Sequence, residues 1–273
     1  MSKVLVSEEN LTNIANAIRE KNGETTTYKP GDMATAIQEI SGGKYAPRHI
    51  SFYRCPLTNI NDDLSNLDTS NVISMESMFE HSRISTLDVS NFDTRNVTTM
   101  KAMFSYASSL TSLDISNFDT SKVTEIDQMF SSNTKLTSLK LPSINGKLIK
   151  TLNTVFYDTR ALVTLNLGHW DLSNVSEMSS PFYNMSKLEN FTFPLNLGAG
   201  FDTSMAANHS FCKIDLSKST LLTHDSLMSV INNIYDIASK GCKVQTLSIG
   251  STNLAKLTED EIAIATNKGW NVT

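Results

Sequence analysis

The chain has 273 residues, of which 40% are apolar and 19% are charged, a composition typical of globular rather than disordered proteins. Its formal net charge of −5 leaves no surplus of Lys and Arg to displace the counterions of nucleic acid, so we expect no nucleic-acid partner. No apolar run reaches the roughly 18 residues of a membrane span, and the first residues lack the apolar core of a secretory signal. We therefore expect neither membrane insertion nor export by the usual route.

The first forty residues predict two short amphipathic helices. Apolar side chains recur at helical spacing in both segments, at Leu11, Ile14, Ile18, Met33 and Ile37. A piece of this size is too small to bury a sound core of its own. Residues 1–43 are therefore interpreted as an attachment or oligomerisation module, with these side chains as its interface, and residues 44–61 as a linker and N-terminal cap.

A repeat of 26 residues fills the region from 62 to 217. The run Leu87–Thr94, LDVSNFDT, recurs as Leu113–Thr120, LDISNFDT. The same spacing continues to Leu139, Leu165 and Phe191. Other apolar columns keep the same step, and chance does not align this many columns. Such a period predicts structural units stacked along one axis.

Each unit is predicted to contain a strand and a helix. Residues 87–89 alternate between apolar and polar side chains, as a half-buried strand does. Residues 94–104 place Val97, Met100, Met103 and Phe104 at helical spacing, with Asp93 at the N-cap position. One unit cannot bury its apolar face alone. The fold class is therefore predicted to be an α/β solenoid, a leucine-rich-repeat-like right-handed coil of about 26-residue strand–helix turns.

Residues 218–273 differ from the repeat and are predicted to form a C-terminal capping unit. The spacing of apolar residues predicts a helix over Asp225–Ser239 and a strand over Val244–Ile249. The segment Thr258–Glu261 has the pattern of a capping box that opens a last helix, and Gly269 is expected to end it.

Motifs of catalysis are missing from the sequence. It contains no HExxH, no GxSxG and no Gly-rich phosphate loop, and its five histidines recur at no ligand spacing. Cys55, Cys212 and Cys242 lack CxxC spacing and are interpreted as buried free thiols. We therefore expect no enzyme activity, no catalytic residues, no cofactor and no metal site. A weak cation site between the repeated Asp88 and Asp114 is kept as an alternative.

Polar side chains between the core positions of the strands are expected to face outward. The predicted ligand-binding positions are Asp88, Ser90, Ser112, Asp114, Ser116, Ser138, Lys140, Asn166 and Thr192. These side chains are small and polar, which suits hydrogen bonding to a glycan. They include none of the aromatic and Arg anchors of tight protein interfaces. The alternative interpretation is a sheet face that is merely solvated.

The repeated phrase at residues 87–104 and 113–130 resembles the BspA-like leucine-rich repeat. That family includes surface proteins of Gram-positive bacteria, mycoplasmas, and anaerobes of the mouth and gut. Residues 248–258, followed by Lys268-Gly269-Trp270, resemble the terminal segment of such arrays. The resemblance covers about residues 62–273 and implies a bacterial surface adhesin or a protein–protein interaction adaptor.

The first forty residues are similar to a short element in tail and baseplate proteins of phages that infect Gram-positive hosts. The similar segments are Leu11–Gly23 and Tyr28–Met33 with Ala36-Ile37. This resemblance implies that residues 1–43 mount the chain on phage tail or baseplate proteins. The resulting hypothesis is that the chain is a host-recognition protein of the virion that binds a glycan or protein of the host cell surface. We expect it to be a homo-oligomer, and a trimer would suit the tip of a phage tail. The alternative is a BspA-like adhesin at the bacterial cell surface.

Overall fold

The structure is a computed structural model that describes residues 50–55, 61–65, 67–144, 147–201 and 212–273. The predicted attachment interface at Leu11, Ile14, Ile18, Met33 and Ile37 lies outside the described residues. In chain order, the described helices and strands are α3 (Asn61–Leu64), β1 (Ser112–Asp114), β2 (Ser138–Lys140), β3 (Thr164–Asn166), β4 (Met178–Ser179), β5 (Asn190–Thr192), β6 (Cys212–Asp215), α4 (His224–Asn233), β7 (Gln245–Ser248), α5 (Ser251–Leu254), α6 (Glu259–Asn267) and β8 (Trp270–Val272).

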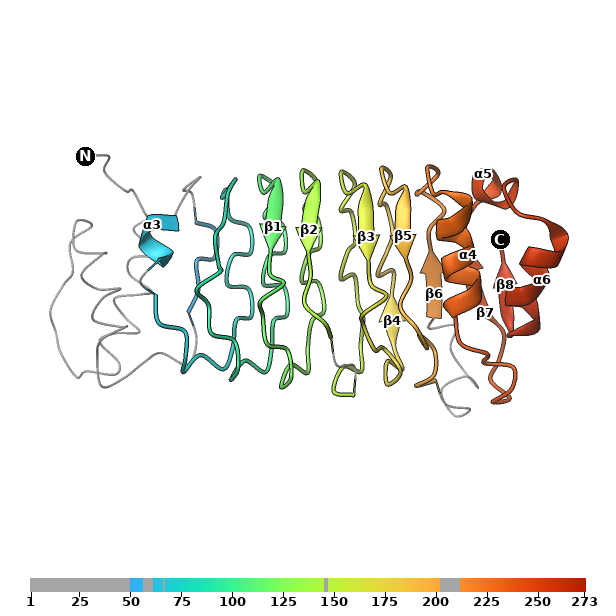
Figure 1. Ribbon diagram of the computed structural model, residues 1–273, viewed down its shortest axis with the longest axis horizontal. Coiled ribbons are helices and arrows are strands. Elements are labelled where there is room, and N and C mark those ends of the chain that lie inside the picture. Colours follow the sequence, from blue (N-terminus) through green and yellow to red (C-terminus); the bar gives the residue numbers. More distant parts are fainter. Residues whose placement is uncertain (1–49, 56–60, 66, 145–146, 202–211) are drawn as a thin grey trace, which may run out of the picture.

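The chain winds in successive coils that lie side by side along the long axis (Figure 1). The strands pair in parallel, with Leu113 of β1 opposite Leu139 of β2 and Leu165 of β3 opposite Phe191 of β5. Both pairs are 26 residues apart, so the structure confirms the predicted register. We propose that this winding is a solenoid of the leucine-rich-repeat kind.

The core of the stack contains a column of phenylalanine rings. Phe79, Phe104, Phe130, Phe156 and Phe182 are each at most 1% exposed. Neighbouring ring centroids are 5.3 to 6.1 Å apart and the rings are nearly parallel. Offset-stacked pairs of this kind add about 0.5–1.5 kcal/mol each beyond the burial of their area. Repetition of one residue type at one position therefore gives each coil the same contact with the next.

The predicted helix in each repeat is wrong. Residues 94–104 and their counterparts form successive turns instead. The N–H groups of Met100 and Ala102 donate to the next coil, at Glu125 O (2.9 Å) and Asp127 O (2.8 Å), whereas that of Met103 donates within its own coil to Met100 O (3.2 Å). This side of the coil therefore carries a second ladder of hydrogen bonds between coils.

The spacing of the coils explains why this side is not helical. Paired strands lie about 4.8 Å apart, whereas a helix with its side chains is about 10 Å wide. Helices on one side would spread the coils apart there and bend the stack. Because the turns, like the strands, bond from coil to coil, the coils keep one spacing and the stack is straight (Figure 1).

The C-terminal unit continues the strand pairing. Strands β4, β6, β7 and β8 form one parallel sheet, α6 packs against β8, and α4 packs between α6 and β5. The structure confirms the strand at Val244–Ile249 as β7 and the capping box of Thr258 and Glu261 at the start of α6. Among the described residues, no helix combines the length and apolarity needed to cross a bilayer.

The predicted helix over Asp225–Ser239 is too long, because α4 ends at Asn233. Ile234 adopts extended backbone, and the N–H of Tyr235 donates to Leu197 O at 3.1 Å. Pairing with an earlier coil therefore replaces the last turns of the helix. The ammonium of Lys268 compensates for the early end, since it donates to the carbonyls of Ile231, Asn232 and Ile234 at 2.6 to 3.2 Å.

Candidate functional site

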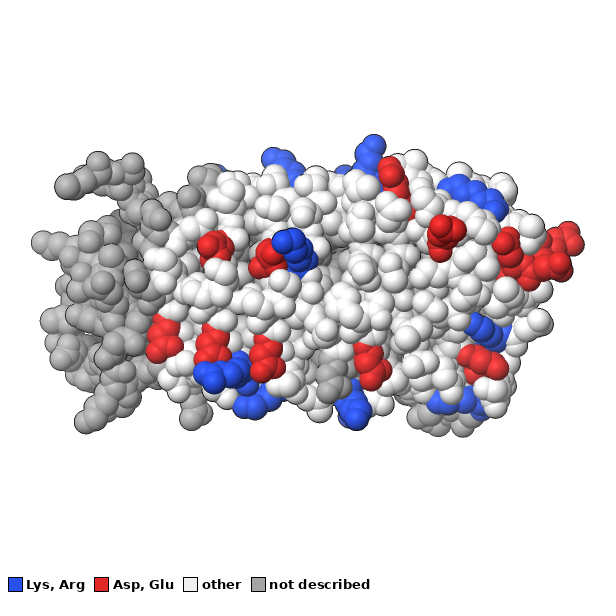
Figure 2. All heavy atoms as spheres, in the orientation of Figure 1, with Lys and Arg blue, Asp and Glu red and all other residues white. Residues whose placement is uncertain are grey.

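The outward strand face, defined by the nine predicted ligand-binding positions, consists of exposed side chains. Register places Ser112 opposite Ser138 and Asp114 opposite Lys140 on β1 and β2. Figure 2 shows mainly uncharged atoms over these strands, with one acidic and one basic side chain in contact. The sequence pattern therefore assigned the exposed positions correctly.

The strand face is divided into two parts. Strand β1 pairs with β2, and β3 pairs with β5, where Asn166 lies opposite Thr192. Among the described residues, β2 and β3 are not paired with each other. The nine positions are consequently not one continuous ladder.

Aspartates at the strand ends hold the backbone as well as facing solvent. Oδ1 of Asp88 accepts the N–H of Ser90 at 2.9 Å, and Oδ1 of Asp114 accepts both the N–H (3.1 Å) and the hydroxyl (2.7 Å) of Ser116. Oδ1 of Asn166 accepts the N–H of Gly168 at 3.0 Å. These side chains form Asx turns that end the strands.

The charge of Asp114 is paired with an ammonium. Nζ of Lys140 lies 2.9 Å from Oδ2 of Asp114. This hydrogen bond, followed by those from Ser116, lowers the pKa of Asp114 to about 2. The alternative cation site between Asp88 and Asp114 is not assembled, because Lys140 occupies the second oxygen of Asp114 and the described residues contain no cluster of three metal ligands.

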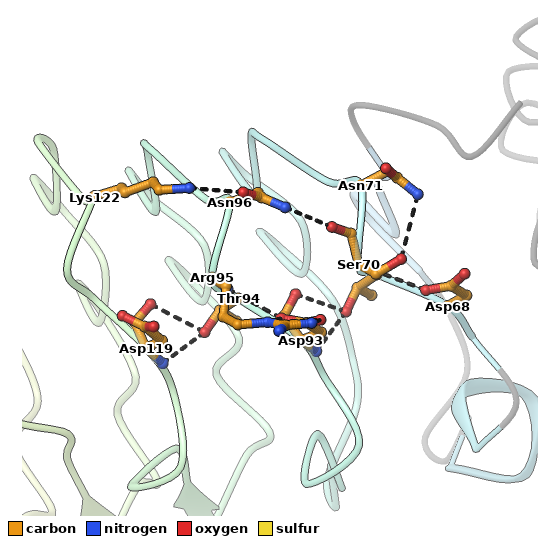
Figure 3. A network of polar contacts seen from close by, with 10 residues as sticks. Asp68, Ser70, Asn71, Asp93, Thr94, Arg95, Asn96, Asp119 and Lys122 are labelled. Atoms are coloured by element: carbon orange, nitrogen blue, oxygen red, sulfur yellow. Dashed lines mark hydrogen bonds and ion pairs between the residues drawn. The ribbon is translucent and has the colours of Figure 1, made fainter.

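A second polar row, which sequence reasoning assigned to helix caps, lies at the corner after the strands (Figure 3). Oγ1 of Thr94, which is 2% exposed, donates to Asp119 O at 3.1 Å and accepts the N–H of Asp119 at 2.7 Å. Thr69 forms the same pair of bonds with Asp93. The Asp-Thr pairs therefore connect neighbouring coils instead of starting helices.

The carboxylates of this corner row accept backbone N–H groups, as caps would, but within turns. Asp93 accepts from Arg95 at 3.2 Å, and Asp119 accepts from Ser121 at 2.8 Å. A hydrogen bond from the side chain of Arg95 lowers the pKa of Asp93, and one from the side chain of Ser121 lowers the pKa of Asp119. Figure 2 shows acidic side chains in a row along the lower side of this face.

A shallow depression of about 490 Å³, open to solvent, lies beside this row and was not predicted from the sequence; it is called the cavity below. Its lining comes from residues 116–121 of one coil, residues 142–144 of the next, and Asp171 of the one after. The available signal was Ile144, which stands where neighbouring coils have Phe118 and Trp170.

Among the cysteines whose side chains the structure describes, Cys55 is buried, as predicted, whereas Cys242 is only half-buried. Its Sγ lies 3.9 Å from the carbonyl of Phe201, at the edge of the C-terminal unit.

Comparison with known proteins identifies one family. A search of curated proteins finds no match. The family model described as "Mycoplasma protein of unknown function, DUF285" matches residues 50–140 and 83–196, which together span more than half of the chain. Both matches begin after residues 1–43, so they include the repeats and not the segment that resembles phage proteins. This family occurs in BspA-like surface proteins of mycoplasmas. The chain belongs to the DUF285 family.

Proposed function

We propose that this chain is a non-enzymatic binding protein whose outward strand face contacts a glycan or protein of a cell surface. The supporting observation is the register of exposed polar side chains, with Ser112 beside Ser138 and Asn166 beside Thr192, over a buried row of apolar ones. Hydrogen bonds between coils fix the backbone of this face. A pre-ordered surface loses little conformational entropy on binding, which favours affinity for a polar ligand.

Two carriers of this binding face are proposed. Attachment to a phage tail or baseplate rests on the resemblance of residues 1–43 to phage proteins. The alternative, a bacterial surface adhesin or adaptor, is supported by membership in the DUF285 family. The same strand face would meet the ligand in both cases.

The strand face is tested by covering it with bulky side chains. Ser112→Trp and Ser138→Trp together add large rings at exposed strand positions, where aromatic residues are well tolerated. The matched control is Lys150→Trp, an exposed position that lies outside the strands. We expect binding of labelled protein to intact host cells to fall at least tenfold for the double variant and to stay unchanged for the control. Equal binding of all three proteins would refute the strand face as the contact surface.

The carrier is tested by immunogold labelling. Labelled tails on purified phage particles would support the phage hypothesis, and deletion of residues 1–43 should then abolish incorporation into the particle. Label on bacterial envelopes alone would exclude the phage hypothesis and support the adhesin.

A further inference from the structure

The strand pairing is interrupted between β2 and β3, which are not hydrogen-bonded to each other in the described chain. The turns of the same two coils remain connected, since the N–H of Leu152 donates to Glu177 O at 3.0 Å. The carbonyl of Pro142 instead faces two side chains of the next coil, with Nε2 of His169 at 3.1 Å and Nε1 of Trp170 at 3.0 Å. Because proline has no N–H, residue 142 cannot donate to a ladder at this point.

A change of side-chain size coincides with the interruption. The corresponding positions of four successive coils are Phe92, Phe118, Ile144 and Trp170. The rings of Phe92 and Phe118 stack with centroids 6.5 Å apart, and this stack ends at the smaller Ile144. The cavity of about 490 Å³ opens here, within the range of about 300–1,000 Å³ that is usual for small-molecule sites.

The lining of the cavity is apolar at one side and polar at the other. Its apolar part is formed by Phe118, Pro142 and Ile144, all mainly buried. Its polar part is formed by the hydroxyls of Ser116, Ser121 and Ser143 and by two carboxylates, those of Asp119 and Asp171. A ligand that fits this lining combines an apolar face with several hydrogen-bonding groups.

The two carboxylates require a ligand that donates hydrogen bonds. Oδ1 of Asp119 accepts the N–H of Ser121, and Oδ1 of Asp171 accepts the N–H of Ser173 at 3.0 Å. Hydrogen bonds from Ser121 and Ser173 lower the pKa of these two carboxyl groups, so both are ionised at neutral pH. An ionised carboxylate only accepts, and each retains acceptor capacity beyond its own turn. An anionic ligand is therefore disfavoured.

Nearby cations decide between a neutral and a positively charged ligand. Lys122 and Arg95 interact electrostatically with Asp119, and Lys147 with Asp171. These basic side chains reduce the attraction of the carboxylates for a further cation, although neither carboxylate forms an ion pair with them in the described part of the chain, where Arg95 pairs with Asp93 and Lys122 donates to Asn96. Hydroxyl donors of a neutral ligand gain the hydrogen bonds without needing that attraction.

We propose that this cavity is a subsite for a neutral pyranose ring of a cell-surface glycan. The ring places its C–H face toward Phe118 and Ile144 and donates hydroxyls to Asp119 and Asp171. The proposal rests on the proposed function, since Ser116 belongs both to the outward strand face and to the cavity. It adds the class of sugar and the place where one ring is held.

Two sets of variants test the subsite. Ile144→Phe restores the ring of the preceding coil and fills the cavity, while Ile144→Leu keeps the volume and serves as its control. Asp119→Asn with Asp171→Asn replaces the ionised acceptors, yet the amide oxygens still accept the backbone N–H groups of the turns. Its control is Asp68→Asn, which occupies the same corner position two coils earlier and is not part of the cavity lining.

The probes are the methyl glycosides of glucose, galactose and mannose, with glucosamine as a cationic and glucuronate as an anionic comparison. Binding to the full chain is measured by saturation-transfer NMR and titration. We expect at least one neutral glycoside to bind, with a loss of at least tenfold in affinity for Ile144→Phe and for the double Asn variant, and no change for either control. Absence of neutral-sugar binding, a preference for glucosamine or glucuronate, or binding that survives Ile144→Phe would overturn the subsite.

Cell binding of the same proteins separates this proposal from the proposed function. Sugar binding that is lost on Ile144→Phe, together with cell binding that is insensitive to the tryptophan variants of β1 and β2, upholds the subsite and refutes the strand face. Cell binding that needs the strand face, without any neutral-sugar binding, refutes only the subsite. Thermal unfolding of each variant is recorded alongside, so that a loss of binding caused by loss of the fold is recognised.

Discussion

Two hydrogen bonds join Thr94 to Asp119 in the next coil. The buried hydroxyl of Thr94 donates to the carbonyl of Asp119 and accepts a hydrogen bond from its N–H. A single side chain thereby satisfies both backbone groups of a residue one coil away. Thr69 does the same for Asp93. Hydrogen bonds of this kind tie the corners of adjacent coils where no strand pairing exists.

Thr94→Val removes both of these hydrogen bonds while keeping the side-chain volume nearly constant. The N–H and C=O of Asp119 lose their partner, and each unsatisfied buried group costs about 1–3 kcal/mol. We expect the free energy of unfolding to fall by about 2–4 kcal/mol in urea denaturation. Thr94→Ser keeps the hydroxyl and is expected to lose less than half as much. Equal losses for the two variants would mean that the methyl group, and not the hydroxyl, matters.

Gln128→Gly tests the replacement of the expected helix by turns. Gln128 has a φ of 61° and an exposed side chain. Glycine adopts this left-handed conformation without the cost of about 1–2 kcal/mol that other residues bear. We expect the substitution to raise the free energy of unfolding by about 0.5–1 kcal/mol, whereas in a helix it would lower it by about 1 kcal/mol.

The control for this substitution is Ala265→Gly, in the last turn of α6, where the residue is helical and buried. It should destabilise the protein by at least about 1 kcal/mol. Destabilisation by Gln128→Gly of the same size would contradict the turn conformation at this position.

The register of the fold could be predicted from the sequence, because aligned apolar columns such as Leu113 and Leu139 leave only one way to stack the coils. The helix could not be distinguished from the turns. Consecutive turns and a helix both bury side chains at the spacing of Met100, Met103 and Phe104. What separates the two structures is a pair of left-handed residues in each coil, four positions apart. These positions hold Ala102 and Tyr106 in one coil and Gln128 and Ser132 in the next, rather than glycine, so no residue type indicated them.

The candidate site was predicted in part. Alternation along the strands correctly assigned the exposed side chains, because a period of two follows directly from strand geometry. The cavity could not be predicted from the repeat, because it lies where coils differ in side-chain volume, at Ile144 between Phe118 and Trp170, and a repeat pattern shows only what the coils share.

Lys268→Met tests the cap at the end of α4. The ammonium donates to three carbonyls, and partial burial lowers its pKa. Hydrogen bonds from charged groups contribute about 1.5–3 kcal/mol, so we expect the free energy of unfolding to fall by about 2 kcal/mol in urea denaturation. The control Lys187→Met lies at an exposed position and should change it by less than about 0.5 kcal/mol. A similar small change for Lys268→Met would show that water caps these carbonyls equally well.

Asp114→Asn tests the contribution of the pair with Lys140 to the pH dependence of stability. The pKa of Asp114 falls from 3.8 to about 2 in the folded protein, first through the hydrogen bond from Lys140. A carboxyl group whose pKa is lower in the folded state stabilises that state above pH 3.8, and this contribution disappears as the pH falls toward 2. The wild type should therefore lose more stability than Asp114→Asn between pH 4 and pH 2, as measured by urea denaturation at each pH.

Because both side chains are at least half exposed, the difference in the free energy of unfolding should stay below about 1 kcal/mol and shrink in high salt. Lys140→Gln should reduce the acid dependence in the same direction, and an unchanged pH profile in both variants would show that the pair does not persist in solution.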